Sequence, residues 1–525
     1  MPQRSQHLAD TTVDAWQHAT GLLVPTLAYE SPDDVAAERE EQHRPTNIRK
    51  QAVSGGAWTI GSYLLLNVQR FVINLIVARL LVPEDFGLAA LLNVVLAGLN
   101  LFSDVGIGPA LIQNKRGEDE RFLRTAFTIQ AGRGVLLFLG GCALGYPLSL
   151  FYGEPRLVYL IPLVASTGLI DGFRSTSYFR LQRHMQIRTL TLLEVGRAAV
   201  SAVVMLVWAW KFPSVYALIA PVIVGTFFDA IVTHFLMRDR FDRFGWDKEA
   251  ARQLFGFGRW IFISTALTFG ASSLDRLVLP NLMPWDEVGV YQIALMLATL
   301  PTIALLSLSQ RVVFPALSRV AAGIDPASPS SESRESFTNA FMRVRRIVLT
   351  LGGFAAAGMF AAGPALVRVA YPADFAEAGM IVQWLAIAGW FHLLEAANGS
   401  AMLAQGQPRW TAFSTGAKVV LLFIGVPLAA GPLGYGLVGA AVAIAIADVG
   451  RYGASLVGSA RLTVAVSPFR MDASFALLAA VSGFGTFALT TTLFESDGIR
   501  FLVGSGIVCV LWALPARKVL KDIRS

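Results

Sequence analysis

The amino-acid sequence predicts an all-α polytopic membrane protein with about 14 transmembrane helices. Two observations lead to this prediction. Of the 525 residues, 54% are hydrophobic and only 15% are charged, whereas an average soluble domain carries about 25% charged residues. In addition, apolar segments of about 20 residues recur along the chain, and this is the length that crosses a hydrocarbon core about 30 Å thick.

Fourteen apolar segments follow one another along the chain, and mostly short polar loops separate them. Residues 1–49, which precede them, are polar and acidic, and their longest apolar run is too short to cross a membrane. We therefore expect residues 1–49 to form a largely disordered cytoplasmic tail. The segments begin near Trp58, Phe86, Leu123, Leu157, Leu190, Val215, Phe257, Gly289, Ile347, Gly379, Thr411, Tyr435, Ala473 and Arg500.

Lys and Arg residues are concentrated in alternate loops between these segments. Loops within 115–124, 174–188, 238–252 and 311–346 each hold several of them, whereas the loops in between hold at most one. Cytoplasmic loops of membrane proteins carry an excess of Lys and Arg. The alternation therefore places both termini in the cytoplasm. It also explains the net charge of +7 without a nucleic-acid partner.

The chain resembles itself at a shift of about 200 residues. Three groups of residues match in the same order: Gly56-Ala-Trp58 with Gly258-Arg-Trp260, Asp85-Phe-Gly87 with Glu287-Val-Gly289, and Pro109-Ala-Leu111 with Pro315-Ala-Leu317. The alternative is chance similarity between apolar helices. A repeat of six spans predicts two pseudo-symmetric six-helix bundles, plus two C-terminal helices, with a transport site between the bundles. The predicted parts are the tail at 1–49, bundles at 50–240 and 241–456, and the two extra helices with a basic cytoplasmic end at 457–525.

Polar side chains form stripes along four of the segments. Asn67, Arg70 and Asn74 lie on one face of the first helix, with Arg70 near the middle of the apolar run. Buried charges in a membrane are costly and usually face protein or water. We predict a polar, partly cationic cavity between the bundles; the alternative is hydrogen bonding between helices without a cavity. The predicted substrate-binding residues are Asn67, Arg70, Asn74, Asn93, Asn100, Asp104, Ser272, Asp275, Arg276, Gln292 and Gln310.

A second group of polar residues lies three positions apart within single segments. Glu194 with Arg197, and Asp448 with Arg451, have the spacing of ion pairs within one helix. Carboxylates inside a membrane also build proton relays, so the same group supplies candidates for ion coupling or for a secondary cavity. These candidates are Arg133, Glu194, Arg197, Asp229 and Glu395.

Several kinds of catalytic motif are absent from the sequence. It contains no Gly-Lys dipeptide and hence no Walker A loop, no His-Glu-x-x-His motif and no Gly-x-Ser-x-Gly motif. The six His residues are dispersed, and both Cys residues, Cys142 and Cys509, lie in apolar runs. We therefore expect neither an enzyme activity nor a metal or other cofactor.

Two motifs resemble those of a known family. Ala78-Arg-Leu-Leu-Val-Pro-Glu-Asp-Phe-Gly87 follows the first segment, and Phe102-Ser-Asp-Val-Gly-Ile-Gly-Pro-Ala-Leu-Ile-Gln113 ends the second. Over about residues 48–520 the chain resembles the polysaccharide-transport (Wzx-type) flippases of the multidrug/oligosaccharidyl-lipid/polysaccharide exporter superfamily. The acidic N-terminal tail departs from a minimal member of that family.

The resemblance implies a function and a set of partners. It implies a flippase of the bacterial inner membrane that moves undecaprenyl-diphosphate-linked oligosaccharide by alternating access, for exopolysaccharide, capsule or O-antigen assembly. Its partners would be that lipid, the bilayer, and a polysaccharide polymerase with export machinery. The main alternative is an ion-coupled drug or metabolite exporter of the same superfamily, with an aromatic and acidic pocket. A membrane glycosyltransferase or polymerase and a structural scaffold are further alternatives.

Overall fold

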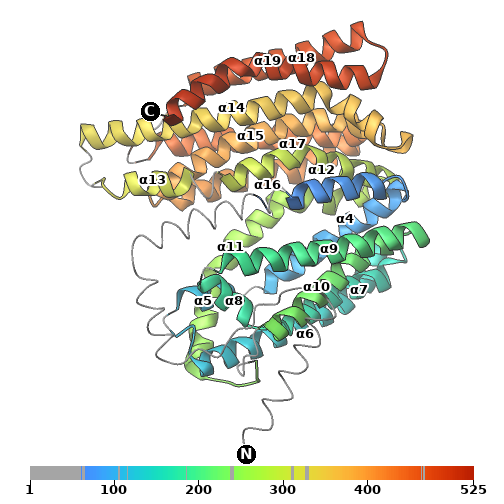
Figure 1. The fold of residues 1–525 in the computed structure, drawn as a ribbon, viewed down its shortest axis with the longest axis vertical. Helices are drawn as coiled ribbons and strands as arrows, with labels where there is room; N and C mark the ends of the chain where they lie inside the picture. Colours follow the sequence, from blue (N-terminus) through green and yellow to red (C-terminus); the bar gives the residue numbers. More distant parts are fainter. Residues whose placement is uncertain are drawn as a thin grey trace, which may run out of the picture. The chain divides into compact units, whose positions relative to one another are not determined.

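A computed structural model describes residues 61, 65–103, 107–114, 116–184, 186–236, 242–308, 313–324, 330–462, 464 and 468–524 (Figure 1). Within these residues the chain contains helices and no strand. The all-α prediction is therefore confirmed. The tail predicted at residues 1–49 lies outside the described residues.

The described part of the first half contains one short apolar helix and seven helices labelled α4 to α10. Pro83 is the first residue of α4, a position where a backbone N–H would have no partner within the helix. The negative charges of Glu84 and Asp85 in the first turn interact favourably with the positive end of the helix dipole. The Asp119 side chain caps α6 by accepting a hydrogen bond from the Arg121 backbone N–H. The helices are Leu65–Val77, α4 Pro83–Ser103, α5 Ile107–Gln113, α6 Glu120–Phe151, α7 Leu157–Gly172, α8 Ser177–Arg183, α9 Ile187–Lys211 and α10 Tyr216–Leu236.

The described part of the second half contains the helices α11 to α19 and two short 3-10 helices. Asp247 caps α11, and Ser330 caps α14, each through hydrogen bonds from backbone N–H groups of the first turn. The elements are α11 Lys248–Val278, η1 Leu279–Asn281, α12 Trp285–Leu308, α13 Phe314–Ala321, α14 Ser331–Ala370, η3 Ala373–Phe375, α15 Ala378–Ala404, α16 Pro408–Ala430, α17 Gly436–Ala460, α18 Phe469–Leu493 and α19 Asp497–Arg524.

The described residues do not account for all fourteen spans that the sequence predicts. In the described residues, 11 helices are long and apolar enough to cross a membrane, or 12 if α7 and α8, bent by 65°, form one broken span. Helix Leu65–Val77 is too short by this measure. α11 has 31 residues, a length that can cross a membrane, and is not among these 11 helices. The count of fourteen is therefore not confirmed.

The matching motifs of the two halves occupy matching places in the structure. In both halves a long helix is followed by a short one: α4 by α5, and α12 by α13. α4 and α12 also pack against each other. A Cβ atom added to Gly87 would lie 2.3 Å from the Trp285 carbonyl oxygen, and one added to Gly289 would lie 1.7 Å from that of Pro83. We call this backbone-to-backbone contact the glycine junction. It brings the N-terminal ends of α4 and α12 together.

Most of the remaining helices pack within their own half, whereas α11 contacts α4 and α6 of the first half as well as α16. α6 packs on α7 and α9 on α10, while α14, α15, α16 and α17 pack together in the second half. α18 and α19 pack against α14 (Figure 1). Gly353 of α14 makes room for the Trp512 ring of α19, since an added Cβ would lie 2.2 Å from that ring. The boundaries at residues 50, 241 and 457 remain predictions.

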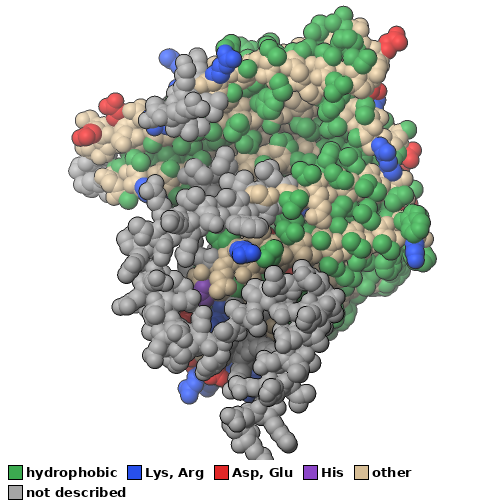
Figure 2. Space-filling view, in the orientation of Figure 1, with side chains coloured by type: hydrophobic (Ala, Val, Ile, Leu, Met, Phe, Trp, Pro, Cys, Tyr) green, Lys and Arg blue, Asp and Glu red, His purple; other side chains and the backbone are tan. Residues whose placement is uncertain are grey.

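The outer surface is rich in large hydrophobic side chains. Trp210, Phe235, Leu502 and Val510 are each at least 70% exposed. Figure 2 shows hydrophobic side chains along the helices and charged side chains gathered near helix ends. A soluble monomer rarely exposes apolar patches of this extent, and lipid is the solvent that suits them. The chain is a multi-pass membrane protein.

Candidate substrate cavity

A cavity of about 430 Å³ lies beside the glycine junction. Five helices line it: Leu65–Val77, α4, α9 and α10 from the first half and α12 from the second. Its apolar wall includes Ile73, Met205, Leu218 and Met296. The cavity therefore lies where the two halves meet.

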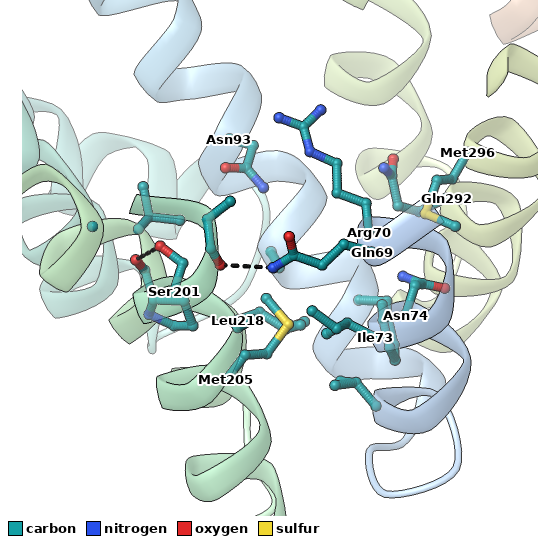
Figure 3. A pocket seen from close by; sticks show the side chains of 18 of the residues that line it. Gln69, Arg70, Ile73, Asn74, Asn93, Ser201, Met205, Leu218, Gln292 and Met296 are labelled. Carbon is teal, nitrogen blue, oxygen red and sulfur yellow. Dashed lines mark hydrogen bonds between the residues drawn. The ribbon is translucent and has the colours of Figure 1, made fainter. Parts of the chain in front are cut away.

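Polar side chains enter this cavity from both halves of the chain. Figure 3 shows Arg70, Asn93 and Gln292 pointing into the same space from helix Leu65–Val77, α4 and α12. Gln69 lines the cavity as well and donates a hydrogen bond of 2.9 Å to the Ala198 carbonyl. The polar residues of the described lining are Gln69, Arg70, Asn74, Asn93, Arg197, Ser201 and Gln292.

Arg70 is the main source of positive charge in the cavity. Its side chain is exposed, and it makes no hydrogen bond or ion pair with any residue that the structure describes. Arg197 adds a second guanidinium, whose Nε atom lies 3.5 Å from Asp229 Oδ2. The described lining contains no carboxylate, and Phe86 is its one aromatic residue. The cavity is therefore cationic, and a free guanidinium suits a phosphate or carboxylate ligand.

The cavity is flanked by contacts that join the two halves. Asn74 accepts a hydrogen bond of 3.1 Å from the Tyr371 hydroxyl, and Arg79 donates one of 3.3 Å to the Ala370 carbonyl. The Phe86 and Phe375 rings meet edge-to-face at 5.7 Å. Together with the glycine junction, these contacts hold helix Leu65–Val77 and α4 against α12, the end of α14 and η3.

Four predicted substrate-binding residues meet in the cavity: Arg70, Asn74, Asn93 and Gln292. Other predicted substrate-binding residues make hydrogen bonds to residues outside the described cavity lining. Asp275 accepts a hydrogen bond from the Tyr291 hydroxyl, Ser272 donates to the Thr268 carbonyl, and Arg276 donates to the Ser272 carbonyl. Asn100 accepts from the Arg133 guanidinium at 3.2 Å. Asn67 is absent from the described lining, and Asp104 and Gln310 lie outside the described residues.

The ion pairs predicted within single helices are wrong, because the stronger partners come from neighbouring helices. Arg197 pairs with Asp229 of α10, and Glu194 is exposed. In α17, Asp448 pairs with Lys418 of α16, while Arg451 pairs with Glu395 of α15 at 2.7 Å. A spacing of three residues shows which side chains share a helical face, but not which helix packs there.

Sequence reasoning missed a fully buried ion pair in the second half. Arg345 lies in a segment that looked like a basic loop, yet it is part of α14 and 0% exposed. Its Nε atom donates to Asp472 Oδ1 at 2.6 Å, and Nη1 donates to Asn398 Oδ1 at 2.7 Å. The Tyr452 hydroxyl also donates to Asp472. The one sequence signal was Asp472 itself, an acid at the start of an apolar segment.

Comparison with known proteins identifies the family. Residues 76–379, more than half of the chain, match the family model described as polysaccharide biosynthesis protein. The chain belongs to this family. TuaB, the teichuronic acid biosynthesis protein of Bacillus subtilis (strain 168), is similar to this chain over most of the length of both proteins. The two are 24% identical over 481 residues, which cover 89% of this chain and 96% of TuaB.

Two further similarities support the resemblance noted in the sequence. The lipopolysaccharide biosynthesis protein WzxC of Escherichia coli (strain K12) is 20% identical over 275 residues, which cover 52% of this chain and 56% of WzxC. The solved structure of lipid II flippase MurJ in an inward closed conformation superposes with a TM-score of 0.69 at 13% identity, covering 89% of this chain and 100% of MurJ. The resemblance to Wzx-type proteins is confirmed, and the chain shares the fold of the MurJ structure.

Proposed function

We propose that this protein is a flippase for undecaprenyl-diphosphate-linked oligosaccharide repeat units, and not an enzyme. It moves them across the bacterial inner membrane for exopolysaccharide, capsule or O-antigen assembly. The observation that carries this proposal is the cavity between the two halves, where Arg70 has no partner among the described residues and no carboxylate lies in the described lining. The family membership and the names of the relatives support the pathway.

The chemistry of the lining suits a lipid-linked sugar diphosphate. The Arg70 guanidinium can hold two phosphate oxygens at once through its planar fork. Asn93, Gln292 and Asn74 offer amide donors and acceptors that suit sugar hydroxyls. The isoprenoid tail stays in the bilayer while the headgroup occupies the cavity. A drug exporter with an acidic, aromatic pocket would need a different lining.

Alternating access then requires the halves to separate at the glycine junction and to close at the opposite end. On the pattern of basic loops, both termini lie in the cytoplasm, and the glycine junction lies toward the periplasm. A headgroup would enter from the cytoplasm and leave when the junction opens. A polymerase and the export machinery are the partners that would receive the unit there.

The test is a reconstituted flipping assay with lipid-linked oligosaccharide and Arg70 variants. A charge-assisted hydrogen bond contributes about 1.5–3 kcal/mol, so Arg70→Ala should weaken headgroup binding by about tenfold or more and abolish measurable flipping. Arg70→Lys should recover only part of the activity, because an ammonium lacks the planar fork. Arg121→Ala, which removes an exposed arginine outside the cavity, is the matched control and should flip normally.

Normal flipping by well-expressed Arg70→Ala protein would contradict the proposed site. Absence of flipping by the unmodified protein, together with export of organic cations, would favour the drug exporter. Binding of undecaprenyl diphosphate without sugar provides a separate readout, since it isolates the phosphate contact from the hydroxyl contacts.

A further inference from the structure

Two arginines and one tryptophan meet where α16 begins and α17 ends. Arg409 and Trp410 lie in the first turn of α16, and Arg461 is the first residue after α17. The guanidinium carbon of Arg409 lies 5.6 Å from the centre of the Trp410 ring, and that of Arg461 lies 5.3 Å from it. We call these three residues the arginine–tryptophan cluster. None of them belongs to the described lining of the cavity beside the glycine junction.

The Trp410 ring is held in place by both helices. Its Nε1 atom donates a hydrogen bond of 3.2 Å to Gln407 Oε1. Gly458 of α17 makes room for this side chain, because a Cβ added to Gly458 would lie 2.9 Å from Trp410 Cβ and 2.8 Å from Met402 Cε. The position of the ring is therefore fixed by close packing between α16 and α17.

The segment that carries Arg461 is fixed as well. Gln405 Nε2 donates to the Val464 carbonyl at 3.1 Å, and the Val464 N–H donates to Gln405 Oε1 at 3.0 Å. Leu462 and Val464 are buried in one hydrophobic cluster with Met402. These contacts join the turn between α15 and α16 to the segment after α17. Both arginines of the cluster are thus presented from anchored backbone.

The positive charges of the cluster lack a counter-ion within the part of the chain that the structure describes. Arg409 and Arg461 are exposed, and neither makes a hydrogen bond or ion pair with a described residue. Arg368, at the end of α14, differs in this respect because it pairs with Asp497 at 2.8 Å. A cation–π contact leaves the N–H donors at the guanidinium edge available. Two like charges beside one ring repel each other, and a bound anion would relieve that repulsion.

The surface next to the cluster is apolar. Phe413 follows Arg409 by one turn on the same face of α16 and is 54% exposed. Val457 precedes Arg461 by one turn of α17 and is 45% exposed. α16 and α17 both qualify as membrane spans, so the cluster lies where two spans end, a level at which Trp is common in membrane proteins. A ligand that matches this surface has an anionic head and apolar chains.

We propose that the arginine–tryptophan cluster is a binding site for an anionic phospholipid. The guanidiniums of Arg409 and Arg461 donate charge-assisted hydrogen bonds to oxygens of the headgroup phosphate. The acyl chains lie along Phe413 and Val457. On the pattern of basic loops, this end of α16 and α17 faces the cytoplasm, where anionic lipids attract Lys and Arg near the membrane surface. The inference goes beyond the proposed function and does not depend on it.

The test is a lipid titration of the full-length protein in detergent, with bound lipid counted by native mass spectrometry. Dioleoylphosphatidylglycerol should bind more tightly than the zwitterionic dioleoylphosphatidylcholine. Arg409→Gln/Arg461→Gln should weaken phosphatidylglycerol binding by about tenfold or more, because charge-assisted hydrogen bonds to the phosphate are lost. Arg409→Lys/Arg461→Lys should bind with intermediate affinity, since ammonium groups keep the charge without the planar fork.

The matched control is Arg121→Gln/Arg188→Gln, which removes the same net charge from two exposed arginines of the first half. It should bind phosphatidylglycerol as tightly as the parent protein does. Trp410→Leu keeps both charges of the cluster but removes the ring that holds them, so it should also weaken binding. Should Arg409→Gln/Arg461→Gln not fold, the lysine variant and Trp410→Leu take its place.

Three results would overturn the inference: equal affinity for the two phospholipids, parent-like phosphatidylglycerol binding by Arg409→Gln/Arg461→Gln, or an equal loss of binding in Arg121→Gln/Arg188→Gln. Displacement of the lipid by millimolar inorganic phosphate, or tighter binding of undecaprenyl phosphate at the cluster, would overturn the assignment to a phospholipid. None of these measurements uses flipping. A protein that binds phosphatidylglycerol at the cluster and flips no glycolipid would therefore contradict the proposed function alone.

Discussion

Replacing Gly289 with alanine should shift the protein away from the arrangement in which the two halves are joined. The added Cβ would lie 1.7 Å from the Pro83 carbonyl oxygen and 2.5 Å from its carbonyl carbon. Close C–H···O contacts are found at about 3.3–3.6 Å, so α4 and α12 must move apart by roughly 1.5–2 Å at this point. The obstacle is backbone, which cannot rotate away as a flexible side chain can.

The size of the effect follows from the cost of overpacking. Inserting a methyl group into a well-packed contact costs about 1–3 kcal/mol, which corresponds to a shift of about 5- to 150-fold between two arrangements. Only the joined arrangement contains the contact, so the whole cost falls on it. Gly87→Ala should act in the same direction, because its Cβ would lie 2.3 Å from the Trp285 carbonyl oxygen.

The assay is labelling of a cavity cysteine, Ile73→Cys, by a membrane-impermeant thiol reagent added from the periplasmic side. Gly289→Ala should raise the labelling rate and slow flipping, because the cycle must pass through the joined arrangement. Gly358→Ala is the matched control: this glycine of α14 has nothing within 4 Å of an added Cβ, so labelling should not change. Labelling and flipping of Gly289→Ala at the parent rates would refute the reasoning.

Three further outcomes are expected. Arg345→Ala should destabilise the protein by about 3–5 kcal/mol, because Asp472 is left buried without its partner. The double variant Arg345→Met/Asp472→Leu removes both charges and should unfold near the parent temperature. Thermal unfolding in detergent measures both variants. The Arg156 guanidinium, 2.8 Å from Glu154, holds the pKa of that carboxyl below its ordinary value of 4.5. The pair therefore stabilises the protein above pH 4.5, its contribution is lost as pH falls through the lowered pKa, and Arg156→Gln should flatten that part of the pH–stability curve. A reporter fused after Ser525 should be active only in its cytoplasmic form, and a periplasmic signal would contradict the predicted topology.

Much of the fold follows from hydropathy and from the repeat, because both depend on patterns within single segments. Pro83 and Gly87 mark the start of α4, and Gly289 lies near the start of α12, as the self-similarity suggested. The count of fourteen spans stays a prediction. Among the described residues 11 or 12 helices qualify as spans, and α11, whose 31 residues are long enough to cross a membrane, is not one of them.

The candidate site was predictable where one helix face determines it. The stripe of Arg70 and Asn74 was read from spacing alone, and both residues line the cavity. Partners across helices were not predictable, because they depend on packing between segments far apart in sequence. Asp275 is held by Tyr291, and Arg345 is held by Asp472, 127 residues away. A lone sequence contains no information on which polar side chains will meet in this way.

The packing of α19 has a practical consequence for imaging. This 28-residue helix runs from Asp497 to Arg524 and lies against α14 and α18, apart from the glycine junction. A helical scaffold fused in register to its end would continue a rigid element and add a recognisable feature to a 56.6 kDa particle. Because α19 travels with the second half, the tilt of such a fiducial relative to the detergent belt would report rotation of that half in single-particle images.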